Sequence, residues 1–195
     1  MAEFKNSAGR VFQIKPLPPL QDAIIIKNVR RKWLDENGSM PTVPTYSVKT
    51  ASGRVEVYDH DDTTEKNEDE TKAWNEYRMG QAVLERMIYD QRIRAAIQCL
   101  DLDPLEDSRW ISRMKFMGIV LPDDPCELLN LYAETEVIAD GNRDALMLLM
   151  HAAGAAGIID QEVVKSLEDQ FFREDKREDN PGNPERKKKQ KAGGG

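Results

Sequence analysis

The chain has 195 residues, of which 39% are hydrophobic and 32% charged, and its formal net charge at pH 7 is −7. That length suits one domain with a small appendage, and we expect neither a membrane span nor a secretory signal, because no apolar run is long enough for either. Five basic residues gather near the end of the chain, at Arg186, Lys187, Lys188, Lys189 and Lys191. The rest of the chain is therefore more acidic than the whole, which argues against a nucleic-acid-binding domain.

Residues 4–14 predict a β-hairpin. Two short extended segments flank Asn6-Ser7-Ala8-Gly9, a group of turn-forming residues in which glycine can supply a positive φ angle. The following segment, KPLPPL, stops any strand, because proline cannot donate a hydrogen bond to a sheet.

A helix is predicted over residues 21–34. Ile25, Val29 and Trp33 fall four residues apart, and basic residues supply much of the polar side, which is the pattern of an amphipathic helix. Gly38 can take the left-handed conformation that ends a helix. Three consecutive isoleucines also suit a strand, which is the alternative for this segment.

A second β-hairpin is predicted from alternation of residue types on both sides of Ala51-Ser52-Gly53 (Tyr46, Val48, Thr50, Val55 and Val57). Its Gly-Arg-Val at 53–55 repeats that of the first hairpin at 9–11. We interpret both as turns in which glycine turns the chain, arginine begins the return strand in solvent and valine faces inward. A phosphate-binding loop needs GxxxxGK[ST] between a strand and a helix, whereas each of these glycines precedes a strand.

Helical periodicity dominates the rest of the chain. Apolar residues recur at spacings near three, four and seven from about Glu68 to Leu100, which predicts one long helix. Further helices are predicted from their start signals, which are Asp107 or Ser108, Pro125, Asn142 and Asp160.

These elements predict an α+β fold that is predominantly α. N-terminal β-hairpins with a short helix are followed by a bundle of about five helices. We divide the chain into a β-rich portion with one helix at 1–62 and a helical body at 63–172, which together form one folded unit. The segment 173–195 is predicted to be a disordered charged tail, because it has almost no apolar residues to bury.

Candidate catalytic and metal-binding residues are few. The densest group of possible metal ligands is DHDD at 59–62, on which a small metal-dependent hydrolase would depend. We interpret it instead as a solvated strand exit whose carboxylates favour the positive end of the next helix. His151 lies in an apolar helix and is interpreted as a packed, hydrogen-bonded core residue. Cys99 and Cys126 lack disulfide or zinc spacing and are both predicted to be small buried hydrophobes.

No catalytic motif occurs in the chain, and acid–base chemistry would have only two histidines to use. We therefore expect no enzyme, no catalytic residue, no metal and no cofactor.

Methionines in predicted helices offer a possible partner-binding surface, because the flexible thioether adapts to more than one partner shape. The candidates are Met114, Met117, Met147 and Met150. Core packing is the alternative, since the segment ALMLLMHAAGAAG has the composition of a buried helix.

Four segments, taken in order, resemble the tail assembly chaperones of long-tailed phages and prophages. They are AEFKNSAGRVFQIKPLPPL, PTYSVKTASGRVEVYDHD, TKAWNEYRMGQAVLERM and WISRMKFMGIVLPDDPCELLNLYAETEVIADGNRDALMLLM. The likeness covers most of residues 3–172, and none of the segments is a catalytic signature.

The resemblance implies a non-enzymatic protein in the cytoplasm of the bacterial host. Such a protein coats the tape measure protein, helps tail tube subunits assemble around it, and is typically absent from the finished virion. Its expected partner is the tape measure protein, and the tail tube protein and a second copy of the chain are further candidates. The alternative is a minor tail or connector protein that stays in the virion and uses the N-terminal hairpins for strand addition.

The family often produces a longer form by ribosomal frameshifting near the end of the gene. Lys187 to Lys189 can be encoded by an unbroken run of adenines, on which a ribosome slips readily. We therefore weigh two interpretations of this lysine run, a by-product of nucleotide-level selection and a solvated solubility tail.

Overall fold

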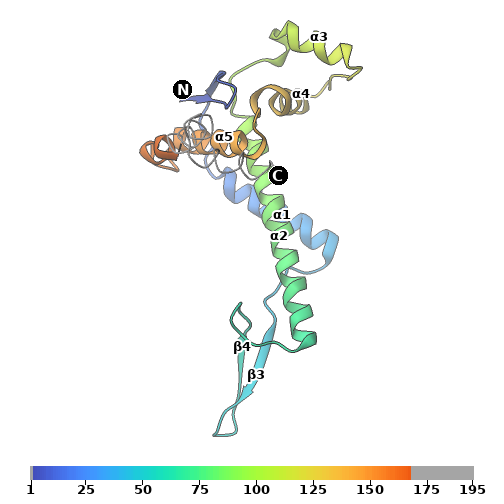
Figure 1. Cartoon of the computed structure of the whole chain (residues 1–195), viewed down its shortest axis with the longest axis vertical. Helices are drawn as coiled ribbons and strands as arrows, with labels where there is room; N and C mark the ends of the chain where they lie inside the picture. Colours follow the sequence, from blue (N-terminus) through green and yellow to red (C-terminus); the bar gives the residue numbers. More distant parts are fainter. Residues whose placement is uncertain (1, 168–195) are drawn as a thin grey trace, which may run out of the picture. The chain divides into compact units, whose positions relative to one another are not determined.

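The structure is a computed structural model, and it describes residues 2–167 of the chain (Figure 1). The fold is α+β and mostly helical, as predicted, with two N-terminal β-hairpins and a helix between them, followed by about five helices. Contacts divide the described residues into two compact units, of which unit 1 comprises residues 2–19 and 93–167 and unit 2 comprises residues 20–92. The predicted boundary at residue 62 lies inside unit 2, and the predicted tail lies outside the described residues.

Unit 1 combines the first hairpin with most of the helices. Its elements are β1 (Ala2–Lys5), β2 (Val11–Ile14), a 3₁₀ turn (Pro104–Glu106), α3 (Ser108–Phe116), α4 (Pro125–Tyr132), a π-helical turn (Ala133–Val137) and α5 (Gly141–Ala155). Residues 161–167 are also helical. The single helix predicted from Pro125 is therefore an α-helix that continues into one π-helical turn, with Pro125 in the first turn as expected.

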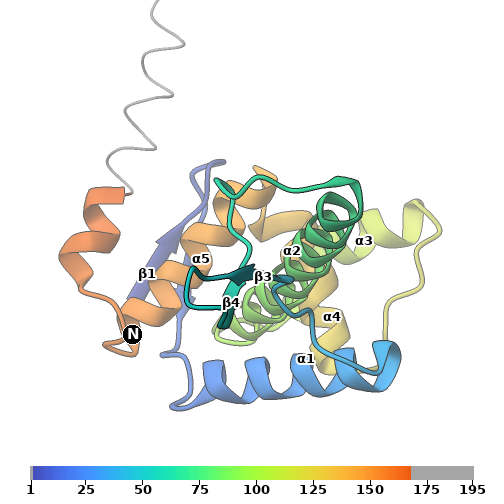
Figure 2. The same cartoon turned by 90° about the horizontal axis from the view of Figure 1, so that it is seen from below.

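The first hairpin packs against α5 (Figure 2). Phe4 lies opposite Phe12 in the β1–β2 ladder, both are buried, and their ring centroids are 6.2 Å apart. Phe4 also meets the ring of His151 on α5 at 5.8 Å, edge to face. Beyond β2, the Leu17 N–H donates to the Ala152 carbonyl at 3.2 Å. His151 is thus a buried, packed core residue, as predicted.

Unit 2 contains α1 (Gln21–Asn37), β3 (Thr45–Lys49), β4 (Val55–Asp59) and α2 (Glu68–Ile97) up to residue 92. The isoleucine-rich segment is a helix and not a strand, and α1 ends at Gly38, which has φ 76°. Arg92 on α2 donates from Nε and Nη2 to the Asp22 carboxylate at 2.6 and 3.0 Å, and this pair joins the two helices.

A reciprocal capping box begins α2. The Asn67 side chain accepts from the Glu70 N–H at 2.9 Å, while the Glu70 carboxylate accepts from the Asn67 N–H at 2.9 Å. This arrangement satisfies two backbone donors that the helix itself cannot pair. The sequence N-x-x-E at 67–70 is the signal for this capping box. It was not predicted, because the DHDD carboxylates were assigned to the start of this helix instead.

Both hairpins use the same turn, which explains the repeated Gly-Arg-Val. The Asn6 N–H donates to the Arg10 carbonyl and the Gly9 N–H to the Asn6 carbonyl, and Thr50, Gly53 and Arg54 repeat the pattern. Gly9 and Gly53 both have φ 81°, as a three-residue hairpin loop with a left-handed last residue requires. The interpretation as turns is confirmed.

The prediction that valine faces inward after each turn is wrong. Val11 and Val55 are 55% and 64% exposed, and Phe12 and Ile14 are the residues of β2 that are buried. Successive strand residues point to opposite faces of a sheet. If the residue that faces the core is assigned one position away from the true one, every side chain of the strand is placed on the wrong face.

Among the described residues, no helix is both long and apolar enough to span a membrane.

Candidate partner-binding surface

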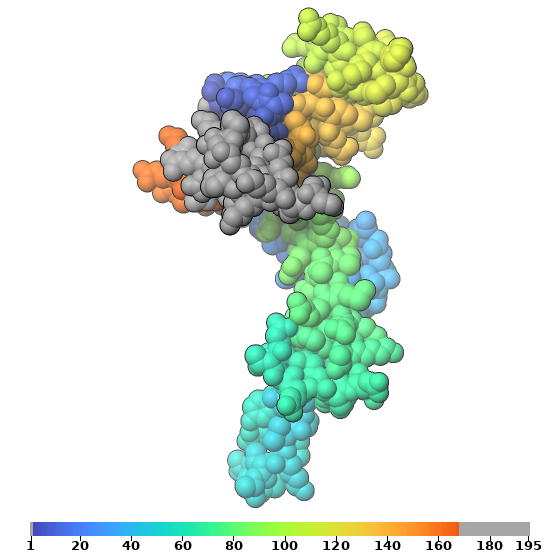
Figure 3. Space-filling model, viewed as in Figure 1, coloured from blue at the N-terminus to red at the C-terminus, as the bar shows by residue number. Residues whose placement is uncertain are grey.

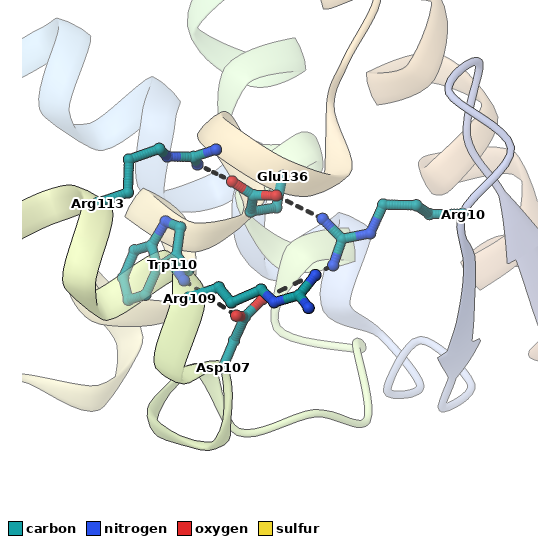
Figure 4. A pocket seen from close by; sticks show the side chains of 6 residues that line it. All are labelled: Arg10, Asp107, Arg109, Trp110, Arg113 and Glu136. Carbon is teal, nitrogen blue, oxygen red and sulfur yellow. Dashed lines mark hydrogen bonds and ion pairs between the residues drawn. The ribbon is translucent and has the colours of Figure 1, made fainter.

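A charged pocket of about 480 Å³ lies in unit 1 between the first hairpin turn, α3 and the π-helical turn (Figure 4). It is lined by Arg10, Asp107, Arg109, Trp110, Arg113 and Glu136. Three guanidinium groups and two carboxylates therefore surround one hollow, which leaves an excess of positive charge in an otherwise acidic chain.

Glu136 is the centre of the ionic network. Arg10 and Arg113 approach its carboxylate from opposite sides, and each forms an ion pair with it (Figure 4). The Arg10 Nη2 also donates to the Tyr132 hydroxyl at 3.1 Å, and it lies 3.8 Å from the Asp107 carboxylate. These contacts hold two of the three arginines in place.

Asp107 is the N-cap of α3, as predicted. Its carboxylate accepts from the Trp110 backbone N–H at 3.0 Å and from the Tyr132 hydroxyl at 3.1 Å. The Trp110 N–H, the Tyr132 hydroxyl and the nearby Arg10 cation hold the pKa of Asp107 below its ordinary value, against the opposing effect of burial. The cap thus stays ionised beside the guanidinium groups.

Arg109 differs from the other two arginines. Its side chain is exposed, and within residues 2–167 it has no ion pair and no side-chain hydrogen bond. The excess positive charge of the pocket is therefore carried by a group that is free to meet an anion.

An exposed apolar segment follows directly from α3. The side chains of Phe116 and Val120 are 91% and 89% exposed, and Met117 and Ile119 are also exposed. The helix ends in a Schellman motif, in which the Ile119 N–H donates to the Met114 carbonyl at 2.9 Å and Gly118 has φ 73°. This motif gives the segment a defined backbone conformation. Figure 3 shows the segment at the surface, in yellow-green.

The cationic and apolar residues belong to one surface. Arg109, Arg113 and Phe116 follow one another at spacings of four and three positions, so they share one side of α3. Met117 is the C-cap residue, four positions after Arg113. We call this the α3 surface, and define it by Arg10, Arg109, Arg113, Phe116, Met117 and Val120.

The four methionine candidates do not form one surface. Met114 and Met147 are buried and Met150 is half-buried, so their side chains pack in the interior of unit 1. Met117 is exposed and belongs to the α3 surface.

Phe116 and Val120 were not predicted as partner-binding residues, because the candidates were all methionines. The signal that was available is the run FMGIV in a connection between two helices, where polar turn residues are usual.

The DHDD segment lies in unit 2 and differs in part from the interpretation. Asp59, Asp61 and Asp62 are exposed, but His60 is only 3% exposed and packs on the Tyr46 ring at 4.8 Å. The hydroxyl and N–H groups of Thr64 and Thr63 donate to the Asp61 carboxylate, which lowers the pKa of Asp61. No cluster of possible metal ligands occurs among the described residues.

The two cysteines also differ from each other. Cys99 is buried, which raises the pKa of its thiol, as desolvation of a thiolate does. Cys126 is exposed, so the prediction that both are buried is wrong for this residue. It lies in the first turn of α4, one residue after Pro125.

The β3–β4 hairpin is the second exposed feature of the molecule. It forms its own two-stranded sheet, all residues of β4 are exposed, and Val55 and Val57 lie on one face. Two-stranded sheets are marginally stable by themselves, and unpaired strand edges can accept another strand.

Comparison with protein-family models, with curated proteins and with solved structures gave no match.

Proposed function

We propose that the chain is a non-enzymatic tail assembly chaperone of a long-tailed phage or prophage. In this role it binds the tape measure protein in the cytoplasm of the bacterial host, keeps it soluble, promotes tail tube assembly around it, and is left out of the mature virion. The observation that carries the proposal is the exposed apolar segment after α3, with Phe116 and Val120 about nine-tenths exposed. The order of the four sequence segments supports the family.

The chemistry of the client explains why such a surface is needed. A tape measure protein is long and largely helical, so before assembly it exposes apolar stripes that aggregate. Phe116, Met117 and Val120 offer an apolar contact for such a stripe, and the chain's own net charge of −7 favours its solubility.

Co-expression tests this proposal. The tape measure protein from the same genome is expressed alone, with the full chain, or with the double variant Phe116→Ser, Val120→Ser, and its soluble fraction is measured. We expect the full chain to keep it soluble and the double variant to fail. Ile158→Ser is the matched control, since Ile158 is also an exposed apolar residue of unit 1, at 61% exposure. A soluble fraction that does not depend on the chain would contradict the proposal.

A second candidate is a minor tail or connector protein that stays in the virion. The exposed β3–β4 hairpin favours it, because a free strand edge pairs with a neighbouring subunit. Mass spectrometry of purified virions separates the two candidates. A chaperone is absent or strongly depleted relative to infected cells, whereas a connector is present in fixed proportion to the tail tube protein.

A further inference from the structure

We infer that the α3 surface binds an amphipathic helix of a protein partner, with carboxylates at one end of the contact face and large apolar side chains at the other. The inference deepens the proposed function and rests on it for the identity of the client. What it adds is the chemistry that the client segment must have.

The charge of the pocket selects a carboxylate. Arg10 and Arg113 are both paired with Glu136, so neither can turn fully to a partner without giving up its own ion pair with that carboxylate. Arg109 is the guanidinium without such a pair among the described residues, and in Figure 4 its side chain extends to the same side of the pocket as Asp107. A planar guanidinium matches a carboxylate with two parallel hydrogen bonds.

The apolar half of the surface selects a protein and not a small anion. Free phosphate would satisfy Arg109, yet it would leave Phe116, Met117 and Val120 in water. A helix that carries leucine or phenylalanine beside its acidic residues covers both halves at once.

The spacing on α3 sets the spacing on the partner. Arg109 and Phe116 are seven positions apart, which is about 10 Å along a helix at 1.5 Å per residue. A partner helix packed along α3 therefore needs an acidic residue and a large apolar residue about seven positions apart on one face. A spacing of five positions would place them on opposite faces.

The probe is a synthetic helical peptide of about 18 residues with glutamate and leucine seven positions apart. Its binding to the full chain is measured by fluorescence anisotropy at low salt and at about 0.15 M salt. Two matched peptides carry glutamine in place of glutamate, or the five-position spacing. We expect both to bind at least about fivefold more weakly than the probe, a difference of about 1 kcal/mol.

Protein variants locate the site. Arg109→Gln should weaken binding about three- to fivefold without unfolding, since the Arg109 side chain has no ion pair and no hydrogen bond within residues 2–167. Lys115→Gln is its control, because this substitution removes the same charge from the other side of the same helix. Phe116→Ser should weaken binding about tenfold, and Ile158→Ser should not.

Several results would overturn the inference. One is equal weakening by Arg109→Gln and Lys115→Gln, which indicates general charge attraction. Another is equal binding of the glutamate and glutamine peptides. A third is a dimer of the full chain, seen by sedimentation velocity, that Phe116→Ser dissociates, because a second copy would then cover the surface. Peptide binding with no effect on the tape measure protein would contradict the proposed function and leave this inference standing.

Discussion

At the scale of a single residue, Asn6 accounts for the different burial of the two hairpins. It is fully buried, its amide donates to the carbonyls of Glu136 and Val137 at 3.2 and 3.0 Å, and its Oδ1 accepts from the Arg10 N–H. Thr50 has the same place in the second hairpin, but its hydroxyl bonds within its own exposed turn. One side chain that reaches a distant carbonyl thus decides whether a repeated turn is part of the core.

The turn glycines should be needed for their backbone and not for any ligand. We predict that Gly53→Val destabilises unit 2 by about 1 to 2 kcal/mol, because Gly53 has φ 81° and its surroundings are open, so the cost is backbone strain alone. Arg54→Ala should cost less than about 0.5 kcal/mol. Denaturant unfolding followed by circular dichroism measures both. Phosphate or nucleotide binding that disappears in Arg54→Ala would contradict this prediction.

The α3 cap should give the chain a pH dependence in acid. The pKa of Asp107 is lowered from 3.8, so its stabilising effect is present above that value and is lost as the pH falls through the folded pKa. Asparagine still caps a helix, so Asp107→Asn removes only the charge at the start of α3, and it should cost about 0.5 to 1 kcal/mol at pH 7 and progressively less below about pH 4. Asp123→Asn, an exposed carboxylate nearby in sequence, is the control. A difference that persists unchanged at pH 2 would show that the charge of Asp107 plays no part.

At the scale of elements, the first hairpin is held on α5 by one buried carboxylate. Asp144 accepts from the Ser7 N–H at 2.9 Å, the Ser7 hydroxyl at 2.8 Å and the Asp140 N–H at 2.8 Å. The two bonds from Ser7 join residues 137 positions apart in the chain. The second hairpin shows no such long-range bond among the described residues, since the Thr50 hydroxyl bonds only within its own turn.

Removing this carboxylate should loosen the hairpin. We predict that Asp144→Ala lowers the free energy of unfolding of unit 1 by about 2 to 3 kcal/mol, because three part-buried hydrogen bonds to a charged acceptor are lost. Asp140→Ala is the matched control, as only its backbone N–H takes part, and it should cost less than about 0.5 kcal/mol. Amide hydrogen exchange checks the location, since Ser7 should lose protection only in Asp144→Ala.

Signals in the sequence predicted where helices and strands lie better than which of their side chains are buried. Pro125 and Asp160 began helices as expected, and of the two residues predicted for α3 the cap is Asp107, because caps and first-turn prolines act within a few residues. Asn142 did not begin its helix, since α5 starts at Gly141. The charged pocket was not predicted, because Arg10 and Glu136 meet only after the chain has folded across 126 positions. The burial of β2 was inverted for a similar reason, since alternation does not say which face meets a core.

At the scale of the whole molecule, the folded core should end before the charged tail. The last buried apolar residue described is Val164, which packs close to Gly154 on α5. We predict that a chain ending at Phe172 keeps its helical signal and its unfolding free energy. A chain ending at Asp160 loses Val164 and should be less stable by about 2 kcal/mol. Equal stability of the two truncations would contradict this placement of the core.

The central claim is that the chain protects an aggregation-prone helical client through the α3 surface. The most direct measurement is light scattering as a purified tape measure fragment is diluted from denaturant with increasing amounts of the full chain. We expect scattering to fall in proportion to the chain added, and to fall equally with Ile158→Ser, but not with the double variant Phe116→Ser, Val120→Ser. Scattering that stays unchanged with the full chain, or that falls equally with the double variant, would contradict the claim.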